Sequence, residues 1–327
     1  MCVPITAEQR RESECLSNAT LFPSTYRLEW MDEPWADVDE AGEWLLRLAN
    51  DFNPDVVHLN GYAHAALPWP CPVVVVAHSC VLSWWSAVKR ADAPAEYAEY
   101  RQRVAAGLRA ADAVIAPTAA MLETLRTNYE FFAPGAVIPN ARDPHLFEPH
   151  EKRDNIFAAG RLWDEAKNFA ALEAAAPSVT WLIEVAGDSK HPNGGDLHYE
   201  HVRSLGRLSS EQLAERLATS AIYALPARYE PFGLSALEAA LSGCALVLGD
   251  IASLREVWGD AALFVPPDDP VALTDTLNAL IADPAMRGDY AQRARSRAAS
   301  FSPARMAESY RSAYSDCLAS RTAEMTA

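Results

Sequence analysis

Short apolar runs alternate with longer amphipathic stretches along almost the whole chain. Within the runs, apolar residues follow one another instead of alternating with polar ones, which is typical of strands buried on both faces of a parallel sheet. The runs predict strands at Asp55–Asn60, Pro72–His78, Asp112–Pro117, Ala136–Pro139, Asn155–Ala159, Trp181–Ala186, Val202–Leu205, Ala221–Leu225, Ala245–Leu248 and Leu263–Val265. The stretches between them predict helices at Val38–Phe52, Pro94–Ala110, Ala119–Asn128, Asn168–Ala176, Ser210–Thr219, Leu234–Ser242, Ser253–Trp258 and Pro270–Ala282.

Strands that alternate with helices predict an α/β protein whose parallel sheets are covered by helices on both faces. We expect two Rossmann-like, doubly wound domains, residues 1–141 and 142–327. The boundary is placed in the segment NARDPHLFEPHEKR, because prolines and mixed charges are typical of a domain connection. The end of the chain is predicted to be helical, and its last helix could pack back on the first domain. Three pairs of a capping residue and a proline at the first helical position support the helical prediction: Asp269-Pro270, Asp283-Pro284 and Ser302-Pro303.

Charge and cysteine content exclude several classes of function. The 327 residues include 28 Lys+Arg and 44 Asp+Glu, a formal net charge of −16, and both halves are acidic. Nucleic acid and anionic membrane surfaces are therefore disfavoured as partners. No apolar run is long enough to span a bilayer, and the polar N-terminus has no signal-peptide core. The six cysteines are scattered without a CxxC pair, which indicates free thiols and a cytoplasmic location.

The segment ARYEPFGLSALEAALSGC, residues 227–244, places a lone acid in an otherwise apolar helix. Glu238 lies at the edge of the stripe formed by Leu234, Leu237 and Leu241, where an ionised carboxylate is costly unless it is hydrogen-bonded. One interpretation is that a neighbouring arginine or backbone amide satisfies it. The other is that it binds a hydroxylated ligand such as a ribose, while the preceding turn holds a phosphate at the helix start.

A second strand-to-helix turn, in NIFAAGRLWDEAKNFAALEAAA, has the same layout. Arg161 and Lys167 lie in this turn, and Asn168 is a plausible N-cap. Two cations beside a helix N-terminus favour a diphosphate, although solvated surface charges are the common alternative. Ligands bind at the carboxyl ends of the strands in open α/β sheets, so the co-occurrence of the two turns favours a ligand site.

Together, GRLWDEAKN and YEPFGLSALEAALSG resemble the retaining GT-B glycosyltransferases of family 4, which are glycogen-synthase-like. Glu230 and Glu238 stand in the E-x7-E relation of that family, and the resemblance covers nearly all of residues 136–300. It implies transfer of a hexosyl group, with retention, from a nucleotide-diphosphate sugar to an acceptor sugar, glycan or small molecule. It implies no cofactor and no metal.

The resemblance also implies roles for individual residues. Arg161 and Lys167 would bind the diphosphate and stabilise it as it leaves, and Glu238 would bind the ribose hydroxyls. The donor sugar and its phosphates would be held by Glu230 with the backbone of Phe232, Gly233 and Leu234. Gly206 and Leu208 would border the base. His78, at the end of VVVAHS, would contact the sugar or the reacting oxygens; a satisfied histidine at a strand end is the alternative.

Two other groups of residues leave alternatives open. His191, His198 and His201 lie near aspartates and could bind zinc, but their polar, Gly-rich segment is more typical of a surface loop. Trp84 and Trp85 could stack on an acceptor sugar or pack in the core or at an interface.

The chain departs from the family pattern at two places. Its first domain has no segment resembling the family's opening βα unit with its glycine-rich loop, and PNARD stands where PNGVD is usual. The sequence could be an incomplete version of a longer enzyme. Alternatively, it could be a non-catalytic nucleotide-sugar-binding protein or subunit, with a protein partner covering the uncovered sheet edge.

Overall fold

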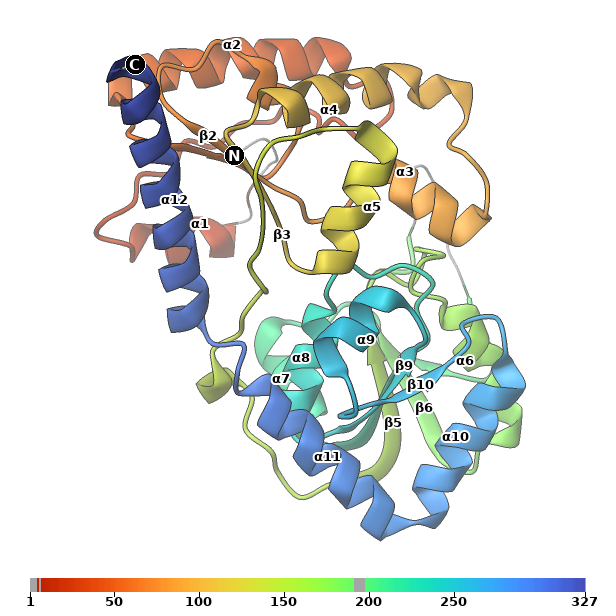
Figure 1. The fold of residues 1–327 in the computed structure, drawn as a ribbon. Coiled ribbons are helices and arrows are strands. Elements are labelled where there is room, and N and C mark those ends of the chain that lie inside the picture. The colour runs from red at the N-terminus through yellow and green to blue at the C-terminus, as the bar shows by residue number, and fades with distance from the viewer. Residues whose placement is uncertain (1–4, 6, 191–197, 327) are drawn as a thin grey trace.

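The computed structural model describes residues 5, 7–190 and 198–326, and it shows two lobes, each built on a parallel sheet (Figure 1). The first lobe has a four-stranded sheet in the order β1-β2-β3-β4, and the second has a six-stranded sheet in the order β10-β9-β8-β5-β6-β7. Every strand overlaps an apolar run that predicted it, which confirms the Rossmann-like α/β fold. The strands are β1 (Val57–Leu59), β2 (Val73–Val76), β3 (Ala113–Ala116), β4 (Gly135–Val137), β5 (Arg153–Ala159), β6 (Leu182–Ala186), β7 (Arg203–Ser204), β8 (Ser220–Leu225), β9 (Ala245–Gly249) and β10 (Leu263–Val265).

The connections between the strands of the first sheet cover one of its faces. Val73, Val75 and Val114 are buried on this face against Val104 and Leu125 of the helices. The covering elements are η1 (Ala63–Ala66), α3 (Val81–Trp84), the π-helix η2 (Trp85–Lys89), η3 (Ala95–Tyr97), α4 (Ala98–Ala110) and α5 (Ala119–Tyr129). Two further helices precede them along the chain, α1 (Ala7–Glu14) and α2 (Trp35–Phe52).

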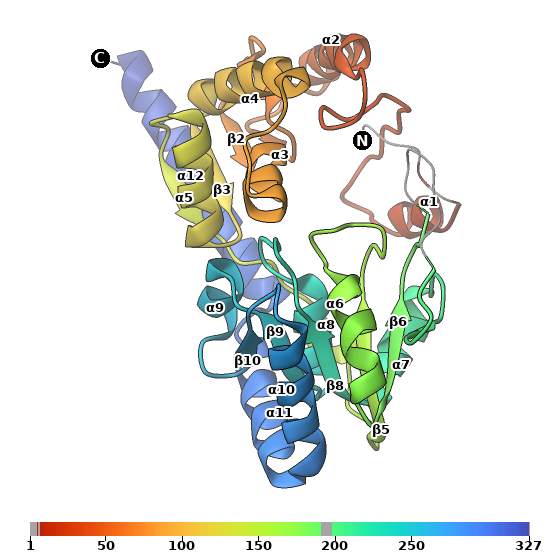
Figure 2. The same ribbon diagram turned by 90° about the vertical axis from the view of Figure 1, so that its right-hand side faces the viewer.

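The opposite face of the first sheet is covered by α12 (Pro303–Thr326), the last helix of the chain. It leaves the second lobe and runs alongside the first (Figure 1, Figure 2). Val74 and Val76 point to this face because successive side chains of a strand alternate between faces. They form one buried cluster with Cys317, against which Tyr310 and Tyr314 pack. The end of the chain therefore completes the core of the first lobe.

In the second lobe, β5 lies between β6 and β8 and pairs in parallel with both. The chain thus builds the sheet outwards in one direction to β7, returns, and builds outwards in the other direction from β8. Such a switch point leaves a crevice at the carboxyl ends of the two central strands. The helices on the two faces are α6 (Phe169–Ala175), α7 (Ser210–Thr219), α8 (Leu234–Leu241), α9 (Ala252–Trp258), α10 (Pro270–Ala282) and α11 (Pro284–Ala298), with the short η5 (Ala176–Ser178) after α6.

The helical region α3–η2 was not predicted from the sequence. Its residues, VLSWWSAVK, include β-branched and aromatic side chains of modest helix propensity. The tertiary structure stabilises it, because Leu82 is buried in the first core and the Cys80 sulfur accepts a hydrogen bond from the Ser83 amide at 3.5 Å. Of the described residues, no helix has both the length and the apolar character needed to cross a membrane.

A pair of substitutions in α12 tests whether this helix is part of the first core. Cys317 is 7% exposed and faces the sheet, whereas its neighbour Leu318 is 39% exposed. Cys317→Asp should lower the free energy of unfolding by about 2 kcal/mol or more, because it buries a polar group without a partner. Leu318→Asp should change it by less than about 0.5 kcal/mol. Urea unfolding followed by circular dichroism measures both, and equal effects would contradict the assignment.

Candidate functional site

The two turns singled out in the sequence follow β5 and β8, which are hydrogen-bonded neighbours. Both turns therefore lie at the same edge of the second sheet, at its switch point and facing the first lobe. The side chain of Asn168 ties them together, donating to the carbonyls of Pro226 at 2.9 Å and Pro267 at 2.6 Å. Asn168 occupies the N-cap position of α6, as predicted, but its side chain does not cap the helix. Its side-chain amide instead joins the turn after β5 to the segments that follow β8 and β10.

Lys167 and Glu230 form an ion pair that joins the two turns, with 2.6 Å between Nζ and Oε2. Their side chains are 16% and 13% exposed, so the pair is largely shielded from water. The other carboxylate oxygen of Glu230 accepts from the amides of Gly233 at 3.0 Å and Phe232 at 3.4 Å. Gly233 has φ +91°, a left-handed conformation that favours glycine. Glu230 thus fixes both its own turn and the direction of the lysine.

Arg161 is held by Asp164, with 2.6 Å between Nη2 and Oδ2, and its guanidinium lies over the ring of Trp163. Asp164 is buried, and its other oxygen accepts from the indole N–H of Trp84 at 3.1 Å. Because Trp84 belongs to α3, this carboxylate connects the predicted phosphate-binding turn to the first lobe. Of the alternatives for Trp84, the structure shows an interface contact.

Glu238 is 7% exposed on α8, among side chains that are otherwise small and apolar. Its partner is Arg142, with 2.5 Å between Nε and Oε1. Arg142 lies in the connection between the lobes, which begins after β4 and ends at β5. A neighbouring arginine therefore does satisfy the lone carboxylate, and its predicted role in binding ribose remains a prediction.

The segment at Gly206, which is predicted to border the base, lies beside the turn after β5. Glycines make the contact between them. The Gly187 amide donates to the Gly206 carbonyl at 2.9 Å. A Cβ on Gly187, which has φ +149°, would lie 1.7 Å from the carbonyl oxygen of Gly160, so no larger residue fits there. Gly206 is exposed, and Leu208 packs partly on the second core. Leu234 begins α8 immediately after the Gly233 turn.

His78 lies at the carboxyl end of β2 in the first lobe and is exposed there, with its Nε2 2.7 Å from the Asn60 side-chain oxygen. Surrounding protein lowers the pKa of His78 by partial desolvation, and His58 lowers it further. Desolvation also lowers the pKa of His58, whose Nδ1 lies 2.6 Å from the Tyr314 hydroxyl of α12. Desolvation thus favours the neutral form of both imidazoles.

Direct contacts hold the first lobe against the β8 turn. The Tyr229 hydroxyl accepts from the Cys80 amide at 3.1 Å, and the Thr118 hydroxyl donates to the Pro231 carbonyl at 3.0 Å. Tyr229 immediately precedes Glu230, and Cys80 lies two residues beyond His78. This contact therefore brings the predicted residues of the two lobes to the same region of the interface, although no direct bond between His78 and Glu230 is present in the described structure.

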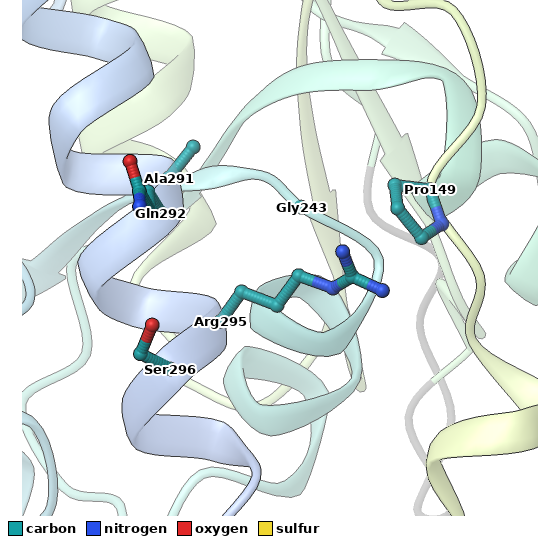
Figure 3. A pocket seen from close by; sticks show the side chains of 6 residues that line it. All are labelled: Pro149, Gly243, Ala291, Gln292, Arg295 and Ser296. Atoms are coloured by element: carbon teal, nitrogen blue, oxygen red, sulfur yellow. The ribbon is translucent and has the colours of Figure 1, made fainter.

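A pocket of about 320 Å³ lies at this interface, lined by residues of both lobes. Its lining includes Ser86 and Thr124 from the first lobe and Glu230 and Ser253 from the second. A second pocket of about 400 Å³ is lined by Gly243 and Arg295 at the opposite edge of the second sheet (Figure 3). That edge carries the amino ends of the strands, whereas ligands bind at the carboxyl ends. We therefore assign the site to the edge that holds the pocket of about 320 Å³.

Sequence reasoning missed Asp164, Arg142 and Tyr229 as parts of the site. Asp164 was inside a quoted motif, but only the fold shows that it contacts Trp84. Among residues 5, 7–190 and 198–326, no three His, Cys, Asp or Glu side chains gather as metal ligands. His191, part of the zinc alternative, lies outside the described residues.

Comparison with known proteins identifies the family. Residues 9–146 match the family described as Glycosyltransferase Family 4, and residues 153–283 match the one described as Glycosyl transferases group 1. The chain belongs to glycosyltransferase family 4. A phosphatidyl-myo-inositol mannosyltransferase of Mycolicibacterium smegmatis is 32% identical over 180 residues, which are 49% of this chain and 46% of that protein. The match thus spans about half the length of that relative.

Solved structures confirm the GT-B architecture expected of a family 4 glycosyltransferase. Sucrose-phosphate synthase from Thermosynechococcus elongatus superposes with a TM-score of 0.77 at 20% identity, covering 91% of this chain and 82% of the other. Anabaena HepE in complex with UDP-glucose superposes with a TM-score of 0.70 at 18% identity, covering 86% and 84%. These identities are low, so the likeness concerns the fold.

The lowered pKa values of His58 and His78 predict that this protein is less stable in acid. Between the lowered values and the ordinary histidine pKa of about 6.5, the unfolded chain binds more protons than the folded one. The free energy of unfolding should therefore fall as the pH decreases through that window. Urea unfolding from pH 5 to 8 should show a shallower slope for the variant His58→Gln, His78→Gln. His145→Gln, on an exposed residue, serves as the control, and an undiminished slope in the double variant would contradict the prediction.

Proposed function

We propose that this family 4 protein transfers a hexosyl group from a nucleoside-diphosphate sugar to a hydroxylated acceptor, with retention at the anomeric carbon. One observation carries the proposal: at the switch point of the second sheet, Lys167 and Arg161 lie in the turn after β5, and Lys167 is ion-paired with Glu230 in the turn after β8. Cations at this edge suit a diphosphate, and a buried carboxylate suits a ribose diol. The complex of HepE with UDP-glucose supports a uridine nucleotide as the first probe.

The ion pairs would direct the cations without using up their donors. An ammonium group has three N–H donors and a guanidinium has five. Glu230 engages Lys167 and Asp164 engages Arg161, so donors on both cations remain for phosphate oxygens. Negative charge builds on the diphosphate as the sugar leaves, and cations already in place favour that transition state without reorganisation.

The interface pocket offers a place for the acceptor. It opens beside Glu230 and is lined by small and hydroxyl-bearing side chains such as Ser86, Thr124 and Ser253. Hydroxyl groups can donate to and accept from a polyhydroxylated molecule. Because both lobes contribute to the lining, an acceptor there would lie against the donor site.

Binding and turnover measured together test the proposal. UDP-glucose, GDP-mannose and ADP-glucose are titrated by calorimetry, and the same mixtures are analysed by mass spectrometry for released nucleoside diphosphate, with and without a sugar acceptor. The proposal expects binding and release of diphosphate for at least one donor. Binding without transfer or hydrolysis would instead identify a nucleotide-sugar-binding protein, and no binding at all would contradict both functions.

Lys167→Ala should depress turnover about 10²–10³-fold while weakening donor binding much less, because the lysine acts mainly on the charge that develops in the transition state. Steady-state kinetics with the donor identified above separate kcat from KM. Arg311→Ala, which removes an exposed cation of α12, is the control. A change confined to KM would contradict the assigned role.

Glu238→Gln should weaken donor binding by roughly 1.5–3 kcal/mol through the loss of a charged hydrogen bond. The matched control is Glu184→Gln, because Glu184 is also buried and arginine-paired but sits on β6 beside Arg203 and Arg216. Calorimetry should show weaker binding only for Glu238→Gln, even where both variants lose stability. Equal donor affinities in the two variants would remove Glu238 from the site.

A further inference from the structure

Arg142 is the cation that contacts the carboxylate predicted to bind ribose, and no role has been assigned to it so far. Its Nε lies 2.5 Å from Oε1 of Glu238, and the two side chains are 36% and 10% exposed. The sequence reads PNARD at this point, so an arginine stands at the position that is valine in PNGVD. The contact is therefore made by a residue in which this chain departs from the usual pattern.

The arginine is itself fixed by the backbone around it. Its amide donates to the Phe301 carbonyl at 3.3 Å, which joins the connection before β5 to the one between α11 and α12. The Phe301 ring meets Phe232 edge-on, with 5.5 Å between ring centroids, and also packs on Trp258. Phe232 belongs to the same turn as Glu230. Arg142 thus sits where both connections between the lobes meet the predicted donor site.

This arrangement restricts what Glu238 can do. A buried carboxylate keeps its charge at acceptable cost only when it is paired, and one well-directed bond also fixes its orientation. Arg142 uses one oxygen of Glu238, and a carboxylate offers a second oxygen to another donor. The guanidinium has further N–H groups, and its fork is rigid and permanently charged.

We propose that Arg142 is a positioning residue that holds Glu238 aimed at the ribose of the donor, and so sets the preference for a ribonucleotide over a 2′-deoxyribonucleotide. The inference rests on the proposed function, because it requires a nucleotide at this edge. Arg142 acts through Glu238, so it should affect recognition of the sugar hydroxyls more than the chemical step.

Calorimetry with paired nucleotides tests the proposal. UDP, GDP and ADP are titrated into the full chain, and the best binder is compared with its 2′-deoxy counterpart. The wild type should prefer the ribonucleotide by roughly 10-fold or more, the value of a charged hydrogen bond. Arg142→Gln keeps most of the side-chain volume but removes the charge. In this variant the affinities for the ribonucleotide and its 2′-deoxy counterpart should differ by less than about 3-fold. Arg311→Gln, in an exposed pair, should leave the preference unchanged.

A double-mutant cycle distinguishes positioning from a general structural role. If Arg142 acts through Glu238, then Arg142→Gln should have little further effect on the preference in a Glu238→Gln background, because coupled residues are not additive. Thermal unfolding of each variant is recorded in parallel. A variant that loses stability but keeps the wild-type preference would overturn the proposal, as would additive effects in the cycle.

The remaining outcomes are also decisive. If Arg142→Gln does not fold, Arg142→Lys carries the test, because an ammonium cannot reproduce the directed Nε contact; the preference should fall, and an unchanged preference overturns the proposal. If the wild type binds none of the three nucleotides, the proposed function itself fails. Binding by the wild type with equal affinity for both sugars leaves the proposed function standing and removes this inference alone.

Discussion

The pairing of β5 with β8 is the constraint on which the rest of the site depends. These strands are separated by two other strands and their helices along the chain, yet they are hydrogen-bonded neighbours at the centre of the second sheet. Their adjacency lets the Lys167 ammonium reach the Glu230 carboxylate over 2.6 Å. Without it, the cationic turn and the acidic turn would be two unrelated surface features. With it, they form one edge that suits a diphosphate.

Ion pairs at this edge serve orientation more than stability. A shielded pair gains Coulomb energy but loses hydration, so its net contribution to folding is small or unfavourable. What each carboxylate supplies is direction: Glu230 fixes Lys167, and Asp164 holds Arg161 while also contacting Trp84 of the first lobe. A site that binds a dianion benefits from cations whose geometry is set before the ligand arrives, because little reorganisation is then required.

The core of the first lobe depends on the last helix of the chain, α12. Its crossover helices cover one face of the sheet, and α12 covers the other with Cys317 and the two tyrosines that contact His58. The chain therefore passes between the lobes twice, and the two passages meet at the hydrogen bond from Arg142 to Phe301. This bond joins the two passages at Arg142, the residue that contacts Glu238.

The sequence by itself determined the strands and most helices, because apolar runs and proline caps are signals carried within each segment. It also determined the two turns of the site and, through resemblance, the family. Only the tertiary structure decided which charges meet. Arg142 and Glu238 are far apart in the chain, and no local pattern records their contact. The same holds for Trp84 with Asp164. For α12, the sequence indicates that the last helix could pack on the first domain, but only the tertiary structure shows which face of the sheet it covers and with which residues. Such pairings follow from how the two lobes pack, and packing is a property of the whole chain.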